Sequence, residues 1–132
     1  MTDAPAYFDT SALTKLILDE EESPRISEFM NTREVSLVSS QLSEVELLRA
    51  VSRSQPGSRP KARELLDRMV LLPITSSILE RAAVLDPPSL RSLDAIHLAT
   101  AVEIKTHLAG VMTYDNRMRK AAEGLQLPVV VA

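Results

Sequence analysis

Short apolar segments alternate with helix-forming segments along the whole chain, and this alternation limits the fold more than any other feature. The apolar segments predict five short strands, at residues 4–8, 35–38, 70–74, 109–113 and 128–131. The segments with helical spacing predict helices at residues 12–18, 24–30, 41–53, 61–69, 76–85, 92–106 and 115–123. Strands that are separated by helices pair in parallel, and the helices cover both faces of their sheet. The sequence therefore predicts an α/β fold, a three-layer α/β/α sandwich with a central parallel sheet.

Length and composition limit the type of protein. With 132 residues, 45% of them hydrophobic, the chain fits one compact domain spanning residues 1–132. The sequence has no apolar run of about 18 residues and no charged start followed by an apolar run, so we expect a cytoplasmic protein without a membrane span. Because the chain has no Cys and two His, a metal site in it must consist mainly of oxygen ligands.

The charge balance leaves a nucleic-acid partner possible. The net charge is −3, and an aromatic content of 3% argues against a base-stacking surface. If a metal neutralises four carboxylates, however, the acidic count falls from 18 to 14 against 15 Lys and Arg. A weakly acidic total therefore does not exclude a nuclease.

Four acidic residues are expected at one edge of the sheet. Asp9 ends the first predicted strand, Asp115 follows the fourth, Asp94 lies in the first turn of a helix that we expect Ser92 to cap, and Glu46 lies within a helix. Ligands of parallel sheets bind beyond the carboxyl ends of the strands, where the strand order reverses. Clustered carboxylates repel one another without a cation, and an oxygen-only set suits Mg²⁺, with Mn²⁺ as a substitute. Such a site can hydrolyse phosphodiester bonds.

Each of these acids also has an ordinary explanation. Asp9 and Asp115 are placed as N-caps of the helices that follow them. Asp94 can complement the dipole of its helix, and Glu46 can be a solvated helical residue. Spacing alone leaves both interpretations open.

Four motifs, in order along nearly the whole chain, resemble the PIN-domain family and specifically the VapC toxins of bacterial VapBC toxin–antitoxin pairs. The first contains Asp9 and the second contains Glu46. The third, around Asp94, is the most specific, and the fourth contains Asp115. The motifs occupy residues 7–13, 40–50, 90–101 and 112–122.

The resemblance implies a Mg²⁺-dependent endoribonuclease that acts on RNA such as transfer RNA or a ribosomal RNA loop. It also implies a homodimer, a toxin–antitoxin hetero-oligomer, and inhibition by a VapB-type antitoxin whose C-terminal segment occupies the site. By motif position, Asp9, Glu46, Asp94 and Asp115 are the catalytic residues. Asp9 and Asp94 are then direct metal ligands, Asp115 binds directly or through water, and Glu46 orients water or acts as a general base.

Several residues keep two interpretations. Helical periodicity does not choose between Glu44 and Glu46, whereas the motif register favours Glu46. His97, three residues after Asp94, is either a structural residue beside the site or a ligand, and Mg²⁺ rarely binds imidazole.

Polar and basic residues near the motifs also remain open. Thr113 and Asn116 flank Asp115 and either hydrogen-bond a ligating group or serve the turn. His107, at a helix end, is expected to complement the helix dipole. One group of basic residues either contacts RNA phosphates or forms a solvated face: Arg49, Arg53, Arg59, Lys61, Arg63 and Arg68.

Three other functions compete with the toxin hypothesis. The first is a catalytically inactive PIN-like module that binds RNA or a protein partner, and the second is a housekeeping RNA-processing nuclease. The third is a phosphatase with Asp9 as its nucleophile, but Ser11 stands where the second Asp of such an enzyme is expected. Intact carboxylates argue against the inactive module.

Overall fold

The computed structural model describes residues 4–32 and 36–130. Its centre is a four-stranded sheet in the order β3-β2-β1-β4, and every neighbouring pair is parallel. The strands are β1 (Ala6–Phe8), β2 (Leu37–Ser40), β3 (Val70–Leu72) and β4 (Gly110–Met112). The predicted strands at 4–8, 70–74 and 109–113 are confirmed, with tighter bounds. The described part of 35–38 belongs to β2, and residue 35 lies outside the described residues.

The predicted last strand is wrong over most of its length. Only Val129 forms a bridge, to Val111 of β4, and residue 131 lies outside the described residues. Pro128 begins this segment and has no N–H to donate to a ladder, although its carbonyl accepts from the Val111 N–H at 2.8 Å. The segment therefore adds two backbone hydrogen bonds beside β4 instead of a fifth strand.

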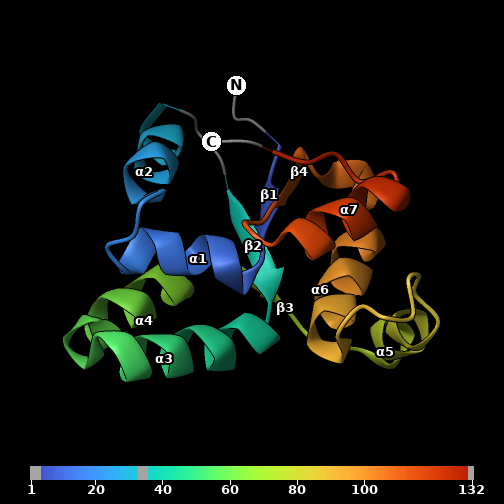
Figure 1. The fold of residues 1–132 in the computed structure, drawn as a ribbon, viewed down its shortest axis with the longest axis horizontal. Helices are drawn as coiled ribbons and strands as arrows, with labels where there is room; N and C mark the ends of the chain where they lie inside the picture. The colour runs from blue at the N-terminus through green and yellow to red at the C-terminus, as the bar shows by residue number, and fades with distance from the viewer. Residues whose placement is uncertain (1–3, 33–35, 131–132) are drawn as a thin grey trace.

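Seven α-helices surround the sheet in the described residues. They are α1 (Thr10–Ile17), α2 (Ser23–Thr32), α3 (Leu42–Ser54), α4 (Arg59–Asp67), α5 (Ser76–Ala83), α6 (Ser92–Glu103) and α7 (Asn116–Gly124). In Figure 1, α1 to α4 lie on one side of the sheet and α5 to α7 on the other. This arrangement confirms the predicted three-layer α/β/α sandwich. No helix among the described residues is long and apolar enough to cross a membrane.

The central strand β1 is buried on both faces of the sheet. Phe8 is fully buried in the cluster formed with α1 to α4, whereas Tyr7, 1% exposed, belongs to the cluster formed with α6 and α7. Successive side chains of a strand point to opposite faces, so a strand between two helical layers favours apolar residues at consecutive positions. This explains why most strand segments are continuous apolar runs rather than alternating ones, and the buried Ser39 and Ser40 of β2 are the exceptions.

Helix starts follow the sequence in two cases. The Asp9 side chain caps α1 and accepts a hydrogen bond from the Ala12 N–H, and the Asp115 side chain caps α7. These caps confirm the structural role that each Asp has in its turn, and they do not exclude a second role for the same carboxylates.

Two details of α6 differ from the prediction. Ser92 is the first residue of the helix rather than its cap, the N-cap is Arg91, and no side chain makes a capping hydrogen bond. The acidic residue of the first turn, Asp94, complements the helix dipole in its place. The helix also ends at Glu103, before the predicted residue 106, and a short 3₁₀ turn follows at Lys105–His107.

The strand order creates a reversal point at β1. Strands β2 and β3 lie on one side of it and β4 lies on the other. Asp9 follows β1 directly, and Asp115 lies three residues after the end of β4. Both caps therefore lie at the edge of the sheet where parallel α/β folds bind ligands.

Candidate active site

Asp9 is a buried carboxylate held by neutral hydrogen-bond donors. Its side chain accepts hydrogen bonds on Oδ1 from the Ser11 hydroxyl at 2.6 Å and the Ala12 N–H at 3.0 Å, and on Oδ2 from the Thr113 hydroxyl at 2.5 Å. Burial raises the pKa of Asp9, and these three hydrogen bonds oppose the rise. No Lys or Arg of the described residues forms an ion pair with Asp9. A buried anion without such a partner favours a bound cation.

Glu46 extends from α3 toward the same edge. Its Oε1 atom accepts hydrogen bonds from the Thr10 hydroxyl at 2.6 Å and from Nε2 of His97 at 2.7 Å. Burial alone would raise the pKa of Glu46, but the bonds from His97 and Thr10 outweigh it, and the pKa lies below its ordinary value. Glu46 is therefore ionised at neutral pH, with one oxygen fixed.

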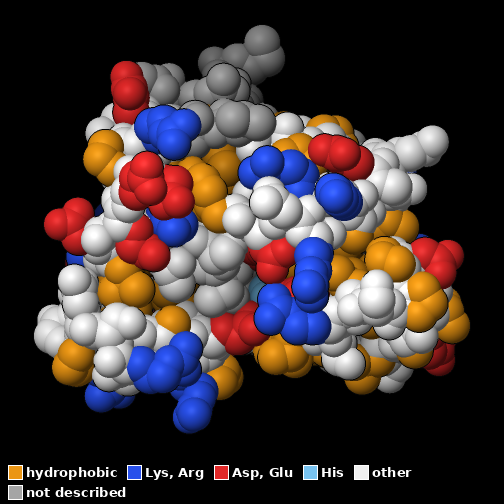
Figure 2. Space-filling view, viewed as in Figure 1, with side chains coloured by type: hydrophobic (Ala, Val, Ile, Leu, Met, Phe, Trp, Pro, Cys, Tyr) orange, Lys and Arg blue, Asp and Glu red, His pale blue; other side chains and the backbone are white. Residues whose placement is uncertain are grey.

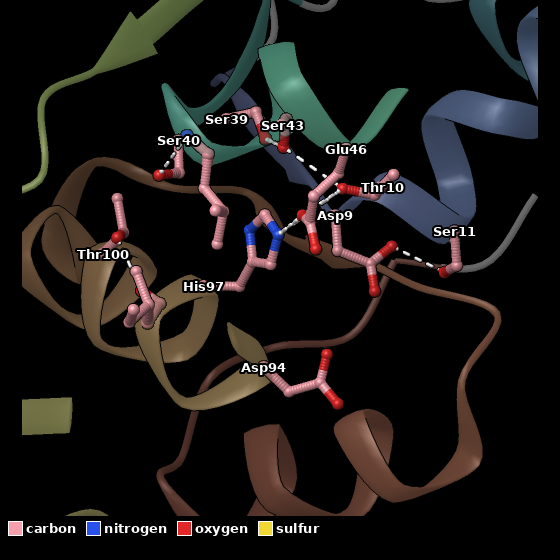
Figure 3. A network of polar contacts seen from close by, with 12 residues as sticks. Asp9, Thr10, Ser11, Ser39, Ser40, Ser43, Glu46, Asp94, His97 and Thr100 are labelled. Carbon is pink, nitrogen blue, oxygen red and sulfur yellow. Dashed lines mark hydrogen bonds and ion pairs between the residues drawn. The ribbon is translucent and has the colours of Figure 1, made fainter. Parts of the chain in front are cut away.

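His97 connects Glu46 to the core. Its Nδ1 atom lies 2.7 Å from the Tyr7 hydroxyl, and the His97 ring is 2% exposed. Burial raises the pKa of Tyr7 far above its ordinary value, so this hydroxyl stays protonated and donates a hydrogen bond to Nδ1 of His97. With Nδ1 accepting from Tyr7, Nε2 of His97 is the atom that donates to Glu46, and the dashed line between these two side chains in Figure 3 marks their contact. The structural interpretation of His97 thus agrees with the geometry, and its partner is Glu46.

Asp94 and Asp115 share one cation. The Arg91 guanidinium donates from Nε to Asp94 Oδ2 at 3.0 Å and from Nη2 to Asp115 Oδ2 at 3.1 Å. The other oxygen of Asp115 accepts the backbone N–H groups of Arg117 at 2.8 Å and Met118 at 3.2 Å. Two helix starts that are far apart in the sequence are therefore joined through one side chain.

Short links join the four predicted carboxylates into one network. Thr10, next to Asp9, donates to Glu46. Thr113 donates to Asp9, and its hydroxyl accepts the Asp115 N–H at 3.1 Å. In Figure 2, acidic and basic side chains face each other in a hollow between the two helical layers, with a His side chain visible between them.

Glu44 lies apart from this network. It forms a surface ion pair with Arg63 at 2.7 Å, and both side chains are well exposed. The geometry therefore supports the motif register, in which Glu46 is the site residue of this helix.

The donor atoms suit a divalent cation, but they are not fully assembled around one position. All four groups are carboxylates, the ligand type that Mg²⁺ prefers. Within residues 4–32 and 36–130, however, no three acidic or His side chains converge closely enough to form a complete metal site. Arg91 holds Asp94 and Asp115, and a cation bound by Asp9, Asp94 and Asp115 would have to replace it.

Of the other residues singled out from the sequence, one hydrogen-bonds a site carboxylate and the others lie on the surface. Thr113 contacts Asp9, as the supporting interpretation requires, while Asn116 is exposed at the first position of α7. Arg63 and Arg68 form surface ion pairs with Glu44 and Glu64.

The sequence reasoning assigned no role to Tyr7, Thr10 or Arg91. Two of these had a usable signal. Thr10 follows Asp9 directly, and Arg91 precedes Asp94 by three residues, the spacing at which helical side chains meet. Tyr7 had none, because a strand residue facing the core looks the same whether or not its hydroxyl has a partner.

Solved structures share this fold. The crystal structure of VapC20 from Mycobacterium tuberculosis, a sarcin–ricin loop cleaving toxin, matches with a TM-score of 0.74 and 13% identity, covering 88% of this chain and 94% of that one. A toxin–antitoxin complex from Klebsiella pneumoniae matches with a TM-score of 0.69 and 22% identity over 96% of both chains. At these identities the likeness establishes the architecture alone.

Sequence comparisons reach further. Ribonuclease VapC47 from Mycobacterium tuberculosis (strain CDC 1551 / Oshkosh) is 43% identical over 116 residues, which covers 85% of each chain. Ribonuclease VapC46 from strain ATCC 25618 / H37Rv is 39% identical over 127 residues, covering 96% of this chain and 97% of that protein. The sequence profile of the PIN domain matches residues 6–124. The chain therefore belongs to the PIN domain family.

Proposed function

We propose that this chain is a Mg²⁺-dependent endoribonuclease and the toxin of a type II toxin–antitoxin pair. Its relatives at 39–43% identity are ribonucleases of the VapC group. The observation that carries the proposal is the polar network that links Asp9, Glu46, Asp94 and Asp115 at the reversal point of the sheet. Capping explains why Asp9 and Asp115 begin their helices, but it does not require them to lie near Glu46 and Asp94. A metal-assisted hydrolytic site uses carboxylates from several segments in this way.

The proposed roles follow from position and burial. A bound Mg²⁺, with Mn²⁺ as a substitute, would polarise a phosphate and lower the pKa of a water molecule. Asp9, Asp94 and Asp115 are the residues that would hold it. Ser11 and Thr113 fix the Asp9 carboxylate by hydrogen bonds and so keep both of its oxygens oriented.

Glu46 is placed to orient the attacking water. Thr10 and His97 both bind Oε1, and Figure 3 draws no contact to the other oxygen. Because the pKa of Glu46 is lowered, its carboxylate is a weak base at neutral pH and a good hydrogen-bond acceptor. Orientation of water is thus favoured over full proton removal as its role.

The proposal includes its partners. The substrate is RNA, such as transfer RNA or a ribosomal RNA loop, in the cytoplasm. A VapB-type antitoxin would inhibit the homodimeric toxin within a hetero-oligomer by placing its C-terminal segment in the site. The antitoxin and the assembly are proposed from the motif resemblance. The fold that this chain shares with the Klebsiella pneumoniae toxin–antitoxin complex is consistent with them.

Cleavage of total RNA by the purified chain tests the enzyme proposal. We expect cleavage with Mg²⁺, none with EDTA, and none from Asp9→Asn or Asp94→Asn. Glu44→Gln is the matched control, since it removes a carboxylate from the same helix as Glu46 but outside the network. RNA that binds without being cut would identify an inactive module instead, and cleavage in EDTA would refute the metal role.

Toxicity in cells tests the toxin proposal separately. Expression of the wild-type chain should stop growth, Asp94→Asn should not, and coexpression of a small neighbouring DNA-binding protein should restore growth. Normal growth with an active nuclease would favour a housekeeping role.

A further inference from the structure

Arg91 engages two of the three proposed metal ligands at once. It lies at the N-cap of α6, pairs with Asp94 three residues away, and reaches Asp115 at the start of α7. Its side chain is 69% exposed, against 18% and 27% for the two carboxylates. The guanidinium therefore covers these carboxylates from the solvent side.

A metal ion and this guanidinium compete for the same oxygens. Asp94 Oδ2 and Asp115 Oδ2 each accept one hydrogen bond from Arg91. A divalent cation bound by these carboxylates would stand within a few ångströms of the guanidinium, and like charges at about 4 Å repel strongly in a partly desolvated site. Metal binding must therefore move Arg91 away from at least one carboxylate.

The displaced guanidinium stays beside the site. Arg91 is the N-cap residue of α6, its long side chain is mostly exposed, and no other acidic residue of the described chain forms an ion pair with it. An anion that reaches the metal from solvent arrives on the side that Arg91 covers. The planar fork of Arg matches the two oxygens of a phosphate group.

We propose that Arg91 binds the RNA phosphate at the cleavage site, and that its ion pairs with Asp94 and Asp115 are its resting position in the metal-free protein. This inference rests on the proposed ribonuclease function. It makes Arg91 both a competitor of the metal and a contact of the substrate, whereas a purely structural Arg91 would only tie α6 to α7.

Two binding measurements separate these roles. Isothermal titration calorimetry with Mn²⁺ alone reports metal affinity without RNA, and filter binding of transfer RNA in Ca²⁺ reports substrate affinity. The variants are Arg91→Met, which removes the charge, and Arg91→Lys, which keeps the charge but not the fork. Arg81→Met is the control, because Arg81 pairs with Glu103 at the opposite end of α6.

The two roles of Arg91 predict that Arg91→Met changes Mn²⁺ affinity and RNA affinity in opposite directions. We expect Mn²⁺ affinity to rise roughly three- to tenfold, since exposed ion pairs are modest competitors. RNA affinity should fall about tenfold, with a loss of roughly one unit in the salt slope. Arg91→Lys should lie between wild type and Arg91→Met in RNA affinity, and Arg81→Met should match wild type in both titrations.

Two outcomes would overturn the inference. Unchanged or weaker Mn²⁺ binding by a folded Arg91→Met would show that Arg91 supports the carboxylates instead of competing with a metal. Unchanged RNA binding would remove its substrate contact. If wild type cleaves RNA but both Arg91 variants match it in these titrations, the role of Arg91 is wrong and the ribonuclease function still stands. If wild type neither binds Mn²⁺ nor cleaves RNA, the proposed function is wrong as well.

Discussion

Replacing Tyr7 with Phe removes one buried hydroxyl and tests how Glu46 is held. Tyr7 is 1% exposed, and its hydroxyl is the donor to Nδ1 of His97 at 2.7 Å. Without it, Nδ1 stays buried with no donor, or His97 moves its proton to Nδ1 and loses its bond to Glu46. Either change leaves one buried polar group unpaired in the interior.

The cost follows from that unpaired group. A buried polar group that loses its partner destabilises a fold by about 1–3 kcal/mol. For a domain of this size, that lowers Tm by roughly 4–10 °C. Because Glu46 would also lose its fixed orientation, we expect kcat for RNA cleavage to fall about tenfold with little change in KM.

Tyr114→Phe is the matched control, because the chain contains two Tyr residues. Tyr114 is half-buried, and among the described residues its hydroxyl has no hydrogen-bond partner. Urea denaturation should place Tyr114→Phe within about 0.5 kcal/mol of wild type. If Tyr7→Phe equals Tyr114→Phe in both stability and kcat, the hydrogen bonds from Tyr7 through His97 do not hold Glu46 in place.

The remaining predictions concern the charges of the site. Burial raises the folded-state pKa of Asp9 above its unfolded value near 3.9. Without metal, wild type should therefore lose stability relative to Asp9→Asn as pH rises through the folded pKa of Asp9. Urea denaturation of both proteins from pH 4 to 7 measures this loss, and equal pH profiles would contradict it. Saturating Mg²⁺ should raise the Tm of wild type and raise that of Asp94→Asn less, as seen by differential scanning fluorimetry. Glu46→Gln should lower kcat at least a hundredfold while Glu44→Gln retains it, and the reverse order would exclude the assigned register.

The sequence predicted the layers of the fold better than its edges. Apolar runs such as the one ending at Phe8 identify buried parallel strands, because both faces of the sheet are covered. The segment at 128–131 has the same composition, yet Pro128 limits its pairing, and pairing depends on neighbours that are distant in the sequence. Ser92 has good capping chemistry but is the first residue inside its helix, so residue type alone assigned the wrong residue as the cap of α6.

The carboxylates were predictable, and their connections were not. Asp9 and Asp115 could be placed at one edge because they follow parallel strands. The contact between His97 and Glu46 joins helices on opposite sides of the sheet, a relation that no local spacing contains. The bridge from Arg91 to Asp115 likewise depends on how α6 and α7 pack together.

The Mg²⁺ dependence of RNA cleavage by wild type and Asp94→Asn tests the central claim most directly. We predict that the wild-type rate rises and saturates with Mg²⁺, returns to zero with EDTA, and is absent for Asp94→Asn at every Mg²⁺ concentration. A wild-type rate that is independent of Mg²⁺, or an Asp94→Asn rate equal to wild type, would contradict the assignment of these carboxylates as the metal site of a ribonuclease.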